Sequence, residues 1–600
     1  MAKAGTQALN VMQPHAGATP PEFSIEVAGE SGSSAALERL RMAAAEFQSL
    51  AIQPLLDGAI AALNRGDIRA AEDWALKALD KDERSGVAWY ALAVAREQSG
   101  DFGSSIKCYE AALKSLPDHA EIANNLGRLA FRLGQLDVAE KLFHHFLTRY
   151  PNHPEGANNL ACALRAQGRF DEAIEVLKAS LTAEPGHAIV WNTLGTVMAE
   201  QGDMANAAIF FDEAIRLDPT LSKARYNRGN MSLALGDPAN ALADCDRALA
   251  QTTALDERAM MRLAKSTILI NLGRIGEGWD EYEARLDPHF AGVTQFIVDR
   301  PNWAPEIDLK GKSLLVIGEQ GLGDEILFAN TVPDILAALG TEGRLSLAVE
   351  PRLVGLFQRS FPSANVGAHA TYDHQGRTVR VAPFLDAKKH ELDFWTPIAS
   401  PLRRFRRTIE SFPPRPGYLV PDPDRVAHWK TLLAELPPGP KIGLLWKSAV
   451  ANSGRHRFFS AFEQWAPILG NRNVTFVNLQ YGDCRPELET AERDFNVKIW
   501  TPPDIDLKQH LDDVAALSCA MDLVIGFSNA TFNIAAACGV PAWLISNPGA
   551  WPRLGTARYP WYPQVRVYLP EGFGAWDPIM ARIGVDVAKL STEWASNVAN

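Results

Sequence analysis

The sequence predicts a chain of two unlike halves, an array of helical repeats followed by an α/β half that forms two lobes. In the first half, glycines recur at a fixed interval of 34 residues. In the second half, short apolar runs alternate with helical patterns, as they do in parallel sheets. The chain has 600 residues, and since a single hydrophobic core stops growing near about 250–300 residues, more than one domain is expected.

Composition narrows the class of protein. A net charge of -12 and a pI near 5.6 argue against general nucleic-acid binding, which needs a basic face. The six cysteines form no CxxC pair, so neither a disulfide scaffold nor a metal site is expected. There is no signal-peptide pattern and no apolar run long enough to span a membrane, which predicts a cytoplasmic protein. Residues 1–33, rich in Ala, Gly, Pro and Ser, are expected to form a disordered tail.

The periodic glycines predict pairs of antiparallel helices. Small residues follow each glycine by five positions, where two helices must touch. The pattern resembles the tetratricopeptide repeat, which has two helices per 34 residues. We expect six clear repeats from about residue 52 to 253 and an offset seventh at 269–286, in a solenoid over 34–290. The periodic glycines are Gly66, Gly100, Gly134, Gly168, Gly202 and Gly236.

Repeat solenoids offer a long groove in which other proteins bind. Asparagines recur on the first helix of successive repeats, and an asparagine amide can both donate to and accept from a peptide backbone. This predicts a groove that captures a segment of an acceptor protein. The alternative is that the repeats are only a spacer or a dimerisation platform. The asparagines are Asn124, Asn125, Asn158, Asn159, Asn192 and Asn227.

The second half is predicted to contain two sheets. Strand-like runs at 312–319 and 344–350 flank a helix that begins near Asp324, which is a β-α-β unit in a lobe over 300–435. A proline-rich segment at 435–441 precedes a second lobe over 440–600, whose expected strands include "VKIWTP" (497–502). Two joined sheets predict a cleft, with ligands at the carboxyl ends of the strands.

Three such strand ends carry polar chemistry. The corner "GEQGLGDE" contains Gly321, Gly323, Asp324 and Glu325, and its glycines let the backbone approach another group, although GxxGxG alone is a weak motif. The loop 444–460 contains side chains that can hold an anionic ligand, namely Lys447, Arg455, His456 and Arg457. The third corner breaks into a helix whose free N–H groups favour phosphate, and its polar residues are Ser528, Asn529, Thr531 and Asn533.

Taken together, these motifs resemble a known family. "LLVIGEQGLGDEILFAN", "IGLLWKS", "DLVIGFSNATFNIAAACGVPAWLI" and "GEGWDEYEARL", combined with the repeats, are similar to the bacterial tetratricopeptide glycosyltransferases. The resemblance implies a GT-B fold with two Rossmann-like lobes, related to O-GlcNAc transferase and the heptosyltransferases. Among these proteins the chain most resembles the flagellin glycosyltransferase type, which adds a sialic-acid-like nonulosonic sugar to serine or threonine.

The resemblance also implies roles for single residues. Asp324 stands where heptosyltransferases have the aspartate proposed as base, although it can equally be the N-cap of the following helix. Lys447 stands where related enzymes have a basic residue that contacts the donor phosphate. Relatives often have "DTxxxHLA" where this chain has Ser528 to Ala535, so the usual acid and histidine are missing. This departure indicates a different donor. For His456 three interpretations stay open: a base, an anion-binding residue, or a loop histidine without a role.

The resulting expectation is a metal-independent protein O-glycosyltransferase that needs no cofactor beyond its nucleotide-sugar co-substrate. The donor is expected to be CMP-activated pseudaminic or legionaminic acid, with its phosphate on Lys447 and the helix start near Asn529, and its carboxylate on Arg455 or Arg457. Flagellin, held by the repeats, is the expected partner. Its acceptor hydroxyl is expected at the loop of Gly321, Gly323 and Glu325 in the first lobe, with the donor in the second lobe. One alternative is a UDP-GlcNAc-dependent protein O-glycosyltransferase. The other is a tetratricopeptide adaptor with a non-catalytic α/β half.

Overall fold

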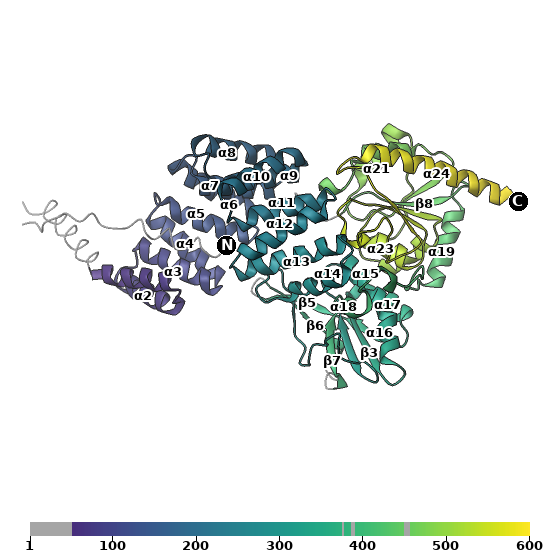
Figure 1. The fold of residues 1–600 in the computed structure, drawn as a ribbon, viewed down its shortest axis with the longest axis horizontal. Helices are drawn as coiled ribbons and strands as arrows, with labels where there is room; N and C mark the ends of the chain where they lie inside the picture. The colour runs from purple at the N-terminus through teal and green to yellow at the C-terminus, as the bar shows by residue number, and fades with distance from the viewer. Residues whose placement is uncertain (1–50, 375–376, 386–390, 449–455, 600) are drawn as a thin grey trace, which may run out of the picture. The chain divides into compact units, whose positions relative to one another are not determined.

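The fold is taken from a computed structural model that describes residues 51–374, 377–385, 391–448 and 456–599 (Figure 1). It divides into two compact units, residues 1–197 and 198–600, which are considered separately below. The division falls inside helix α9 (Ala188–Gln201) and therefore within the repeat array. The expected tail, residues 1–33, lies outside the described residues. Across the described ranges, no helix has the length and hydrophobicity needed to cross a membrane.

The first unit consists of paired helices. Its periodic glycines take the left-handed backbone conformation at the turn inside each pair, with φ of 73° at Gly66 and 87° at Gly100, which glycine adopts without steric cost. Small residues such as Ala71 and Ala139 are fully buried where helices meet. The predicted repeats are therefore confirmed here. The helices cover 51–65, α2 (Ile68–Lys81), α3 (Gly86–Ser99), α4 (Phe102–Ser115), α5 (Ala120–Arg132), α6 (Leu136–Arg149), α7 (Pro154–Ala166), α8 (Phe170–Ala183) and the first part of α9.

The second unit begins with the remaining repeats. The offset seventh repeat exists, but its first helix starts at Leu255, earlier than the predicted segment 269–286. A short 3-10 helix, η1 (Glu283–Leu286), follows its second helix. The helices are α10 (Met204–Leu217), α11 (Ser222–Ala234), α12 (Pro238–Gln251), α13 (Leu255–Asn271) and α14 (Ile275–Tyr282).

A parallel four-stranded sheet forms the first α/β lobe. Its strand order is β4-β3-β2-β7, so the chain winds outward from β2 in both directions and the order reverses between β2 and β7. Such a topological switch point is where open α/β sheets bind ligands. The elements are β2 (Ser313–Ile317), α15 (Leu322–Phe328), α16 (Val332–Leu339), β3 (Arg344–Val349), α17 (Val354–Ser360), β4 (Asn365–Ala368) and β7 (Phe394–Pro397), with a small side sheet of β1 (Gln295–Phe296), β5 (Ala370–His374) and β6 (Arg377–Val381).

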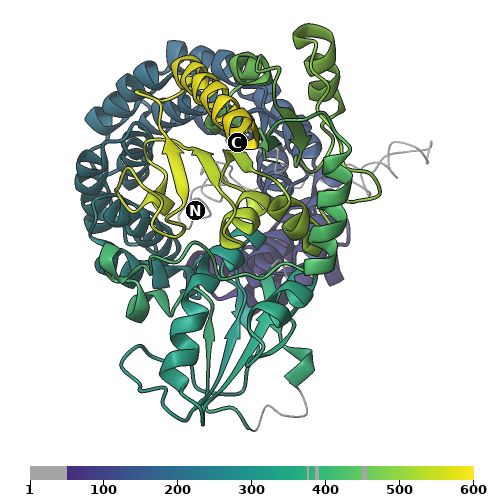
Figure 2. The same ribbon diagram turned by 90° about the vertical axis from the view of Figure 1, so that its right-hand side faces the viewer.

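The second lobe is a parallel five-stranded sheet with the order β12-β11-β10-β8-β9, whose switch point lies between β8 and β10. Helix α24 packs its apolar side on one face of this sheet (Figure 2). The prediction of a strand at 497–502 is wrong, because only Trp500 of this segment pairs with β9, through one isolated bridge. The elements are β8 (Lys441–Leu445), α20 (Ala466–Leu469), β9 (Thr475–Asn478), α21 (Arg485–Phe495), α22 (Leu511–Cys519), β10 (Leu523–Phe527), α23 (Ala530–Ala537), β11 (Ala542–Ile545), β12 (Val565–Tyr568) and α24 (Trp576–Ala599), preceded by α18 (Leu402–Phe405) and α19 (Pro423–Ala434).

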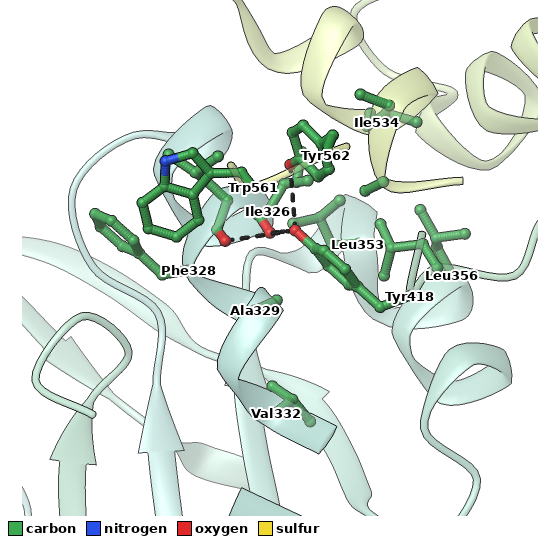
Figure 3. Close-up of a cluster of buried hydrophobic side chains, with 14 of the residues drawn as sticks. Ile326, Phe328, Ala329, Val332, Leu353, Leu356, Tyr418, Ile534, Trp561 and Tyr562 are labelled. Atoms are coloured by element: carbon green, nitrogen blue, oxygen red, sulfur yellow. Dashed lines mark hydrogen bonds between the residues drawn. The ribbon is translucent and has the colours of Figure 1, made fainter. Parts of the chain in front are cut away.

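One hydrophobic core runs through the last repeat and both lobes. Trp279 of α14 is 1% exposed and packs edge-on against Trp561 of the second lobe. Tyr418 donates to the Ile326 carbonyl and lies 3.2 Å from the Tyr562 hydroxyl, which joins the lobes (Figure 3). At these residues the two lobes are therefore in direct contact, where the sequence predicted a cleft between them. A domain boundary near residues 290–300 would also cut through this shared core.

The arginines of segment 401–410 help to hold this core together. Arg406 is 1% exposed, and its guanidinium donates to Asn330 and pairs with Asp334. Arg403 and Arg407 pair with Asp280 of α14. These three arginines are therefore structural and tie the last repeat to the first lobe.

We expect the shared core to decide which truncated chains can fold. A chain that starts at residue 300 should fail to fold cooperatively, because it would expose the apolar surface that Ile270, Ile275 and Trp279 cover. A chain that starts at residue 187, just before α9, should fold. Thermal unfolding followed by circular dichroism checks this. A cooperative transition of residues 300–600 alone would show that the last repeat is dispensable.

Candidate functional site

The two switch-point corners of the lobes lie directly against each other. Gly323, in the first turn of α15, faces the start of α23, and a Cβ there would lie 3.5 Å from Asn533 Nδ2 and 3.6 Å from the backbone of Ala530. The glycine therefore permits the close backbone approach that the glycine motif predicts. Since both corners follow the carboxyl ends of parallel strands, their junction is the candidate functional site.

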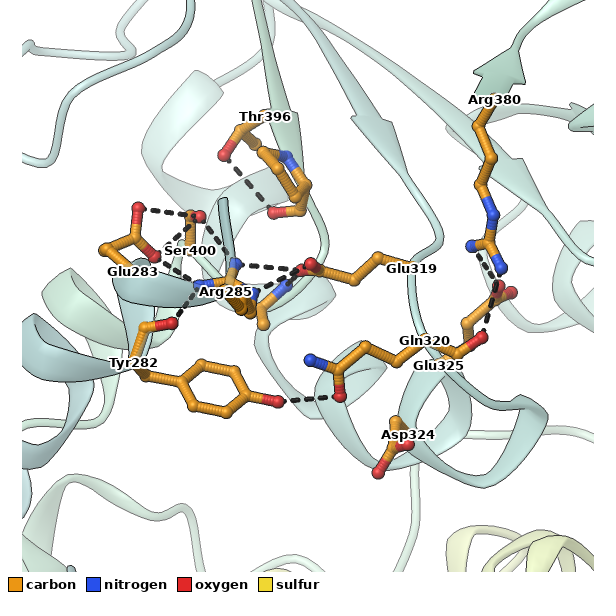
Figure 4. A network of polar contacts seen from close by, with 12 residues as sticks. Tyr282, Glu283, Arg285, Glu319, Gln320, Asp324, Glu325, Arg380, Thr396 and Ser400 are labelled. Atoms are coloured by element: carbon orange, nitrogen blue, oxygen red, sulfur yellow. Dashed lines mark hydrogen bonds and ion pairs between the residues drawn. The ribbon is translucent and has the colours of Figure 1, made fainter. Parts of the chain in front are cut away.

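A buried ion pair anchors the first corner to the last repeat (Figure 4). Arg285 of η1 is 3% exposed and Glu319 is 2% exposed. The guanidinium donates to both carboxylate oxygens of Glu319, at 2.8 and 2.9 Å, and to the Ser400 hydroxyl at 2.9 Å. Burial alone would lower the pKa of Arg285, but the carboxylates of Glu319 and Glu283 outweigh it and the pKa is raised. The guanidinium thus stays charged, and its two hydrogen bonds to Glu319 fix the chain just before the glycine turn.

Glu325 forms a second buried anchor. It is 1% exposed, and its carboxylate accepts from Arg380 at 3.2 Å, His369 at 3.0 Å and the Glu350 N–H at 2.9 Å. A Cβ at Gly318 would lie 2.4 Å from this carboxylate, so only glycine fits there. The expectation that Glu325 faces the acceptor is wrong, because its charge is used inside the lobe.

Asp324 occupies the position between these anchors and α23. Its side chain is half-buried, and it accepts a long 3.4 Å hydrogen bond from the Gly321 N–H at the start of α15. The capping role expected for Asp324 is therefore present but weak. The buried Tyr559, whose pKa is raised mainly by burial and also by the Asp324 charge, belongs to the second lobe. Asp324 thus lies near groups of both lobes, and its role as a base remains a prediction.

The second corner has buried polar atoms that are not satisfied by the described residues. Asn529 caps α23 by accepting the Phe532 N–H at 2.9 Å, but its Nδ2 has no partner there. Asn533, 5% exposed, has an unpartnered Oδ1. Thr531 is 2% exposed, whereas Ser528 is exposed at the surface of the corner. Unsatisfied buried polar groups cost about 1–3 kcal/mol each, so such groups are expected where a polar ligand binds.

The predicted cationic side chains are mostly engaged elsewhere. The Lys447 ammonium donates to the Asp483 carbonyl at 2.9 Å and pairs with Glu487, on the β9 side of β8, whereas Ser528 follows β10 on its other side. Arg457 donates to the Ala199 carbonyl at 2.5 Å in the last turn of α9, and burial lowers its pKa. Both cations are thus paired within the protein, and their assignment to the donor anions stays a prediction. Arg455 and the His456 side chain lie outside the described residues.

We therefore expect Lys447→Ala to have a small effect. Its ammonium is already neutralised by Glu487, and a partly exposed ion pair contributes at most about 1 kcal/mol to stability. The dissociation constant of the predicted nucleotide-sugar donor, measured by calorimetry, should change by less than about threefold. Arg485→Ala, which breaks an exposed pair with Asp483 on the same loop, is the matched control. A loss of affinity of about a hundredfold for Lys447→Ala alone would return this residue to the donor site.

The asparagines of the repeats bond mainly to neighbouring repeats. Asn159 donates to Asn124 at 3.0 Å, and Thr193 donates to Asn158 at 2.5 Å. Asn124 is 1% exposed and Asn192 is 8% exposed, so the expectation that these two face a ligand is wrong. Asn125, Asn158, Asn159 and Asn227 are half-buried and retain partly exposed side chains.

Sequence reasoning missed the residues that hold the first corner. Tyr282 and Arg285 belong to "GEGWDEYEARL", and Gln320 lies inside "GEQGLGDE". Both segments were recognised as motifs, but only the structure shows that they contact each other. The sequence signal for this contact is Gln320, a large polar residue between the turn glycines Gly318 and Gly321.

Fold and site together define a tetratricopeptide-repeat protein with an α/β C-terminal half. The Tetratricopeptide repeat family matches residues 90–154 and 158–222, and such repeats indicate binding to other proteins. The chain is 50% identical over 563 residues to Protein FlbA of Caulobacter vibrioides, an alignment that covers 94% of each protein. The chain therefore belongs to the FlbA family.

Solved structures of other repeat proteins are also similar to part of the chain. A tetratricopeptide repeat protein from Parabacteroides merdae has 15% identity and a TM-score of 0.35, over 39% of this chain and 91% of its own. PilF of Pseudomonas aeruginosa has 19% identity and a TM-score of 0.30, over 33% of this chain and 91% of its own.

Proposed function

We propose that this protein is a metal-independent protein O-glycosyltransferase of the GT-B type, acting in the cytoplasm, with the first lobe on the acceptor side and the second on the donor side. The observation that carries this proposal is the contact between two switch-point corners, one with a half-buried carboxylate at Asp324 and one with unsatisfied amide atoms at Asn529 and Asn533. A two-lobed transferase needs two such corners in contact, because the donor on one lobe and the acceptor on the other must meet.

On the donor side, α23 supplies the positive end of a helix dipole to a departing phosphate. Its first N–H groups are oriented by the Asn529 cap. Donors fixed in advance stabilise the charge that develops as the sugar–phosphate bond breaks. Since Lys447 and Arg457 are engaged elsewhere, the helix start replaces them as the proposed phosphate contact.

On the acceptor side, Asp324 is the proposed base. The acceptor hydroxyl oxygen forms a bond to the anomeric carbon, its proton passes to the Asp324 carboxylate, and the nucleotide leaves with the electron pair of the broken bond. Glu319 and Glu325 do not compete for this role, because buried cations hold both of them.

The choice of substrates rests on the resemblance of the motifs to flagellin glycosyltransferases. We propose CMP-activated pseudaminic or legionaminic acid as donor and flagellin, bound by the repeats, as acceptor. Ser528, where relatives have an acid, removes a negative charge near the expected sugar carboxylate. Arg455 and His456 are the remaining members of the predicted cationic set.

A non-catalytic adaptor is the second candidate. The absence of the family acid and histidine at positions 528 and 533 favours it, and so does the internal pairing of Lys447. An adaptor would bind protein through its repeats but neither bind nor consume a nucleotide sugar.

Binding and hydrolysis of nucleotide sugars separate these candidates. The wild-type chain should bind the CMP-activated nonulosonic acid in calorimetry and release CMP slowly without acceptor. Binding and turnover of UDP-GlcNAc alone would favour a hexosamine transferase. Failure to bind any nucleotide sugar would favour the adaptor.

A further inference from the structure

Gln320 has a conformation that requires support from its surroundings. Its φ is 58°, in the left-handed region that a residue with a side chain rarely adopts, and its side chain is exposed. Such strain persists only where neighbouring groups hold it, and it concentrates at functional sites. Gln320 lies between Glu319 and the glycine turn, on the same corner as Asp324 (Figure 4).

Two direct contacts and one fixed neighbour hold this residue. Arg285 fixes the preceding Glu319, Arg380 donates to the Gln320 carbonyl at 3.0 Å, and the Tyr282 hydroxyl donates to Gln320 Oε1 at 2.7 Å. Tyr282 is 8% exposed and belongs to α14 of the last repeat. Burial raises its pKa, so its hydroxyl stays protonated and remains a donor at neutral pH.

This arrangement orients the amide. Because Oε1 accepts from Tyr282, the two N–H donors of Nε2 are directed elsewhere, and they have no partner among the residues that the structure describes. Asp324 lies four residues later at the same corner, in the first turn of α15, and its negative charge disfavours a second anion nearby. The oxygen that Nε2 meets should therefore be uncharged.

We propose that Gln320 contacts the acceptor segment, donating its amide N–H to an uncharged oxygen, either the reacting hydroxyl or a main-chain carbonyl, and that Tyr282 is the positioning residue that directs it. This inference rests on the proposed transferase function and assigns a specificity residue to its acceptor side. The last helix of the repeats thereby acts on the acceptor site through Gln320, since Tyr282 sets the orientation of this amide.

Two substitutions of Gln320 test the contact in the full chain. Gln320→Glu keeps an oxygen that accepts from Tyr282 but removes the N–H donors. Gln320→Gly removes the side chain and suits the left-handed backbone, so it guards against misfolding. Both should lower kcat/KM for the acceptor about tenfold, mainly through KM, while the dissociation constant of the donor stays within about twofold. Tyr282→Phe should give a smaller change of the same kind.

Gln509→Glu is the control for the added charge, because Gln509 is exposed on a loop of the second lobe, and it should behave like the wild type. If the wild type transfers sugar and both Gln320 variants keep its acceptor KM, the Gln320 inference is wrong while the proposed function stands. A weaker donor affinity with unchanged acceptor KM would also overturn it. If the wild type transfers no sugar from any donor, the proposed function fails and this inference fails with it.

Discussion

Arg285→Ala is expected to lower the free energy of unfolding of the unit that holds residues 198–600 by about 3–5 kcal/mol. The substitution leaves the carboxylate of Glu319, 2% exposed, buried without its cation. It also removes the contact of the guanidinium with Ser400. Denaturant unfolding followed by tryptophan fluorescence should report the loss, because Trp279 and Trp561 lie in the same core.

Arg274→Ala is the matched control for this change. Arg274 pairs with Glu277 at the start of α14, but both side chains are about half exposed, at 46% and 58%. Water screens such an exposed pair, so its loss should leave the free energy of unfolding almost unchanged. If the two variants unfold at the same denaturant concentration, the Arg285–Glu319 pair does not anchor the corner.

Under the proposed transferase function, Asp324→Asn is expected to reduce the rate of sugar transfer by a factor of about 100 to 10,000, the range for loss of a general base. An asparagine can still accept the Gly321 N–H, so the start of α15 should be preserved. The substitution therefore separates the two roles predicted for this residue. Single-turnover transfer, followed by mass spectrometry, measures the rate.

Asp422→Asn is the corresponding control for a purely capping aspartate. Asp422 caps α19 by accepting the N–H groups of Asp424 and Arg425, away from both corners. Its transfer rate should equal that of the wild type. A wild-type rate for Asp324→Asn as well would leave Asp324 with only its capping role.

The repeat array was predictable because each repeat obeys a local rule. A glycine such as Gly100 ends one helix in a left-handed turn, and a small residue such as Ala139 allows the next helix to pack. Strands β2, β3, β8, β10 and β11 were predictable for a similar reason, since buried parallel strands form continuous apolar runs. The segment at 497–502 is less uniformly apolar, and only its Trp500 pairs with the edge strand β9, through a single isolated bridge.

Side-chain partners were not predictable, because they depend on contacts distant in sequence. Lys447 lies near a strand end, where ligand-binding residues are expected, but its ammonium pairs with Glu487, 40 residues later. The recurring asparagines predicted a ligand-binding surface. In the structure, Asn124 and Asn159, 35 residues apart, instead form a hydrogen bond between successive repeats. Arg285 and Glu319 lie in separate motifs and meet only in the fold.

The most direct test of the transferase proposal is the intact mass of purified flagellin after incubation with the wild-type protein and CMP-activated pseudaminic or legionaminic acid. We predict a mass increase of one or more nonulosonic residues, absent with Asp324→Asn over the same time. An increase that matches a hexosamine and requires UDP-GlcNAc would contradict the donor assignment. An unchanged flagellin mass with every nucleotide sugar, from a correctly folded wild-type chain, would contradict the proposed function itself.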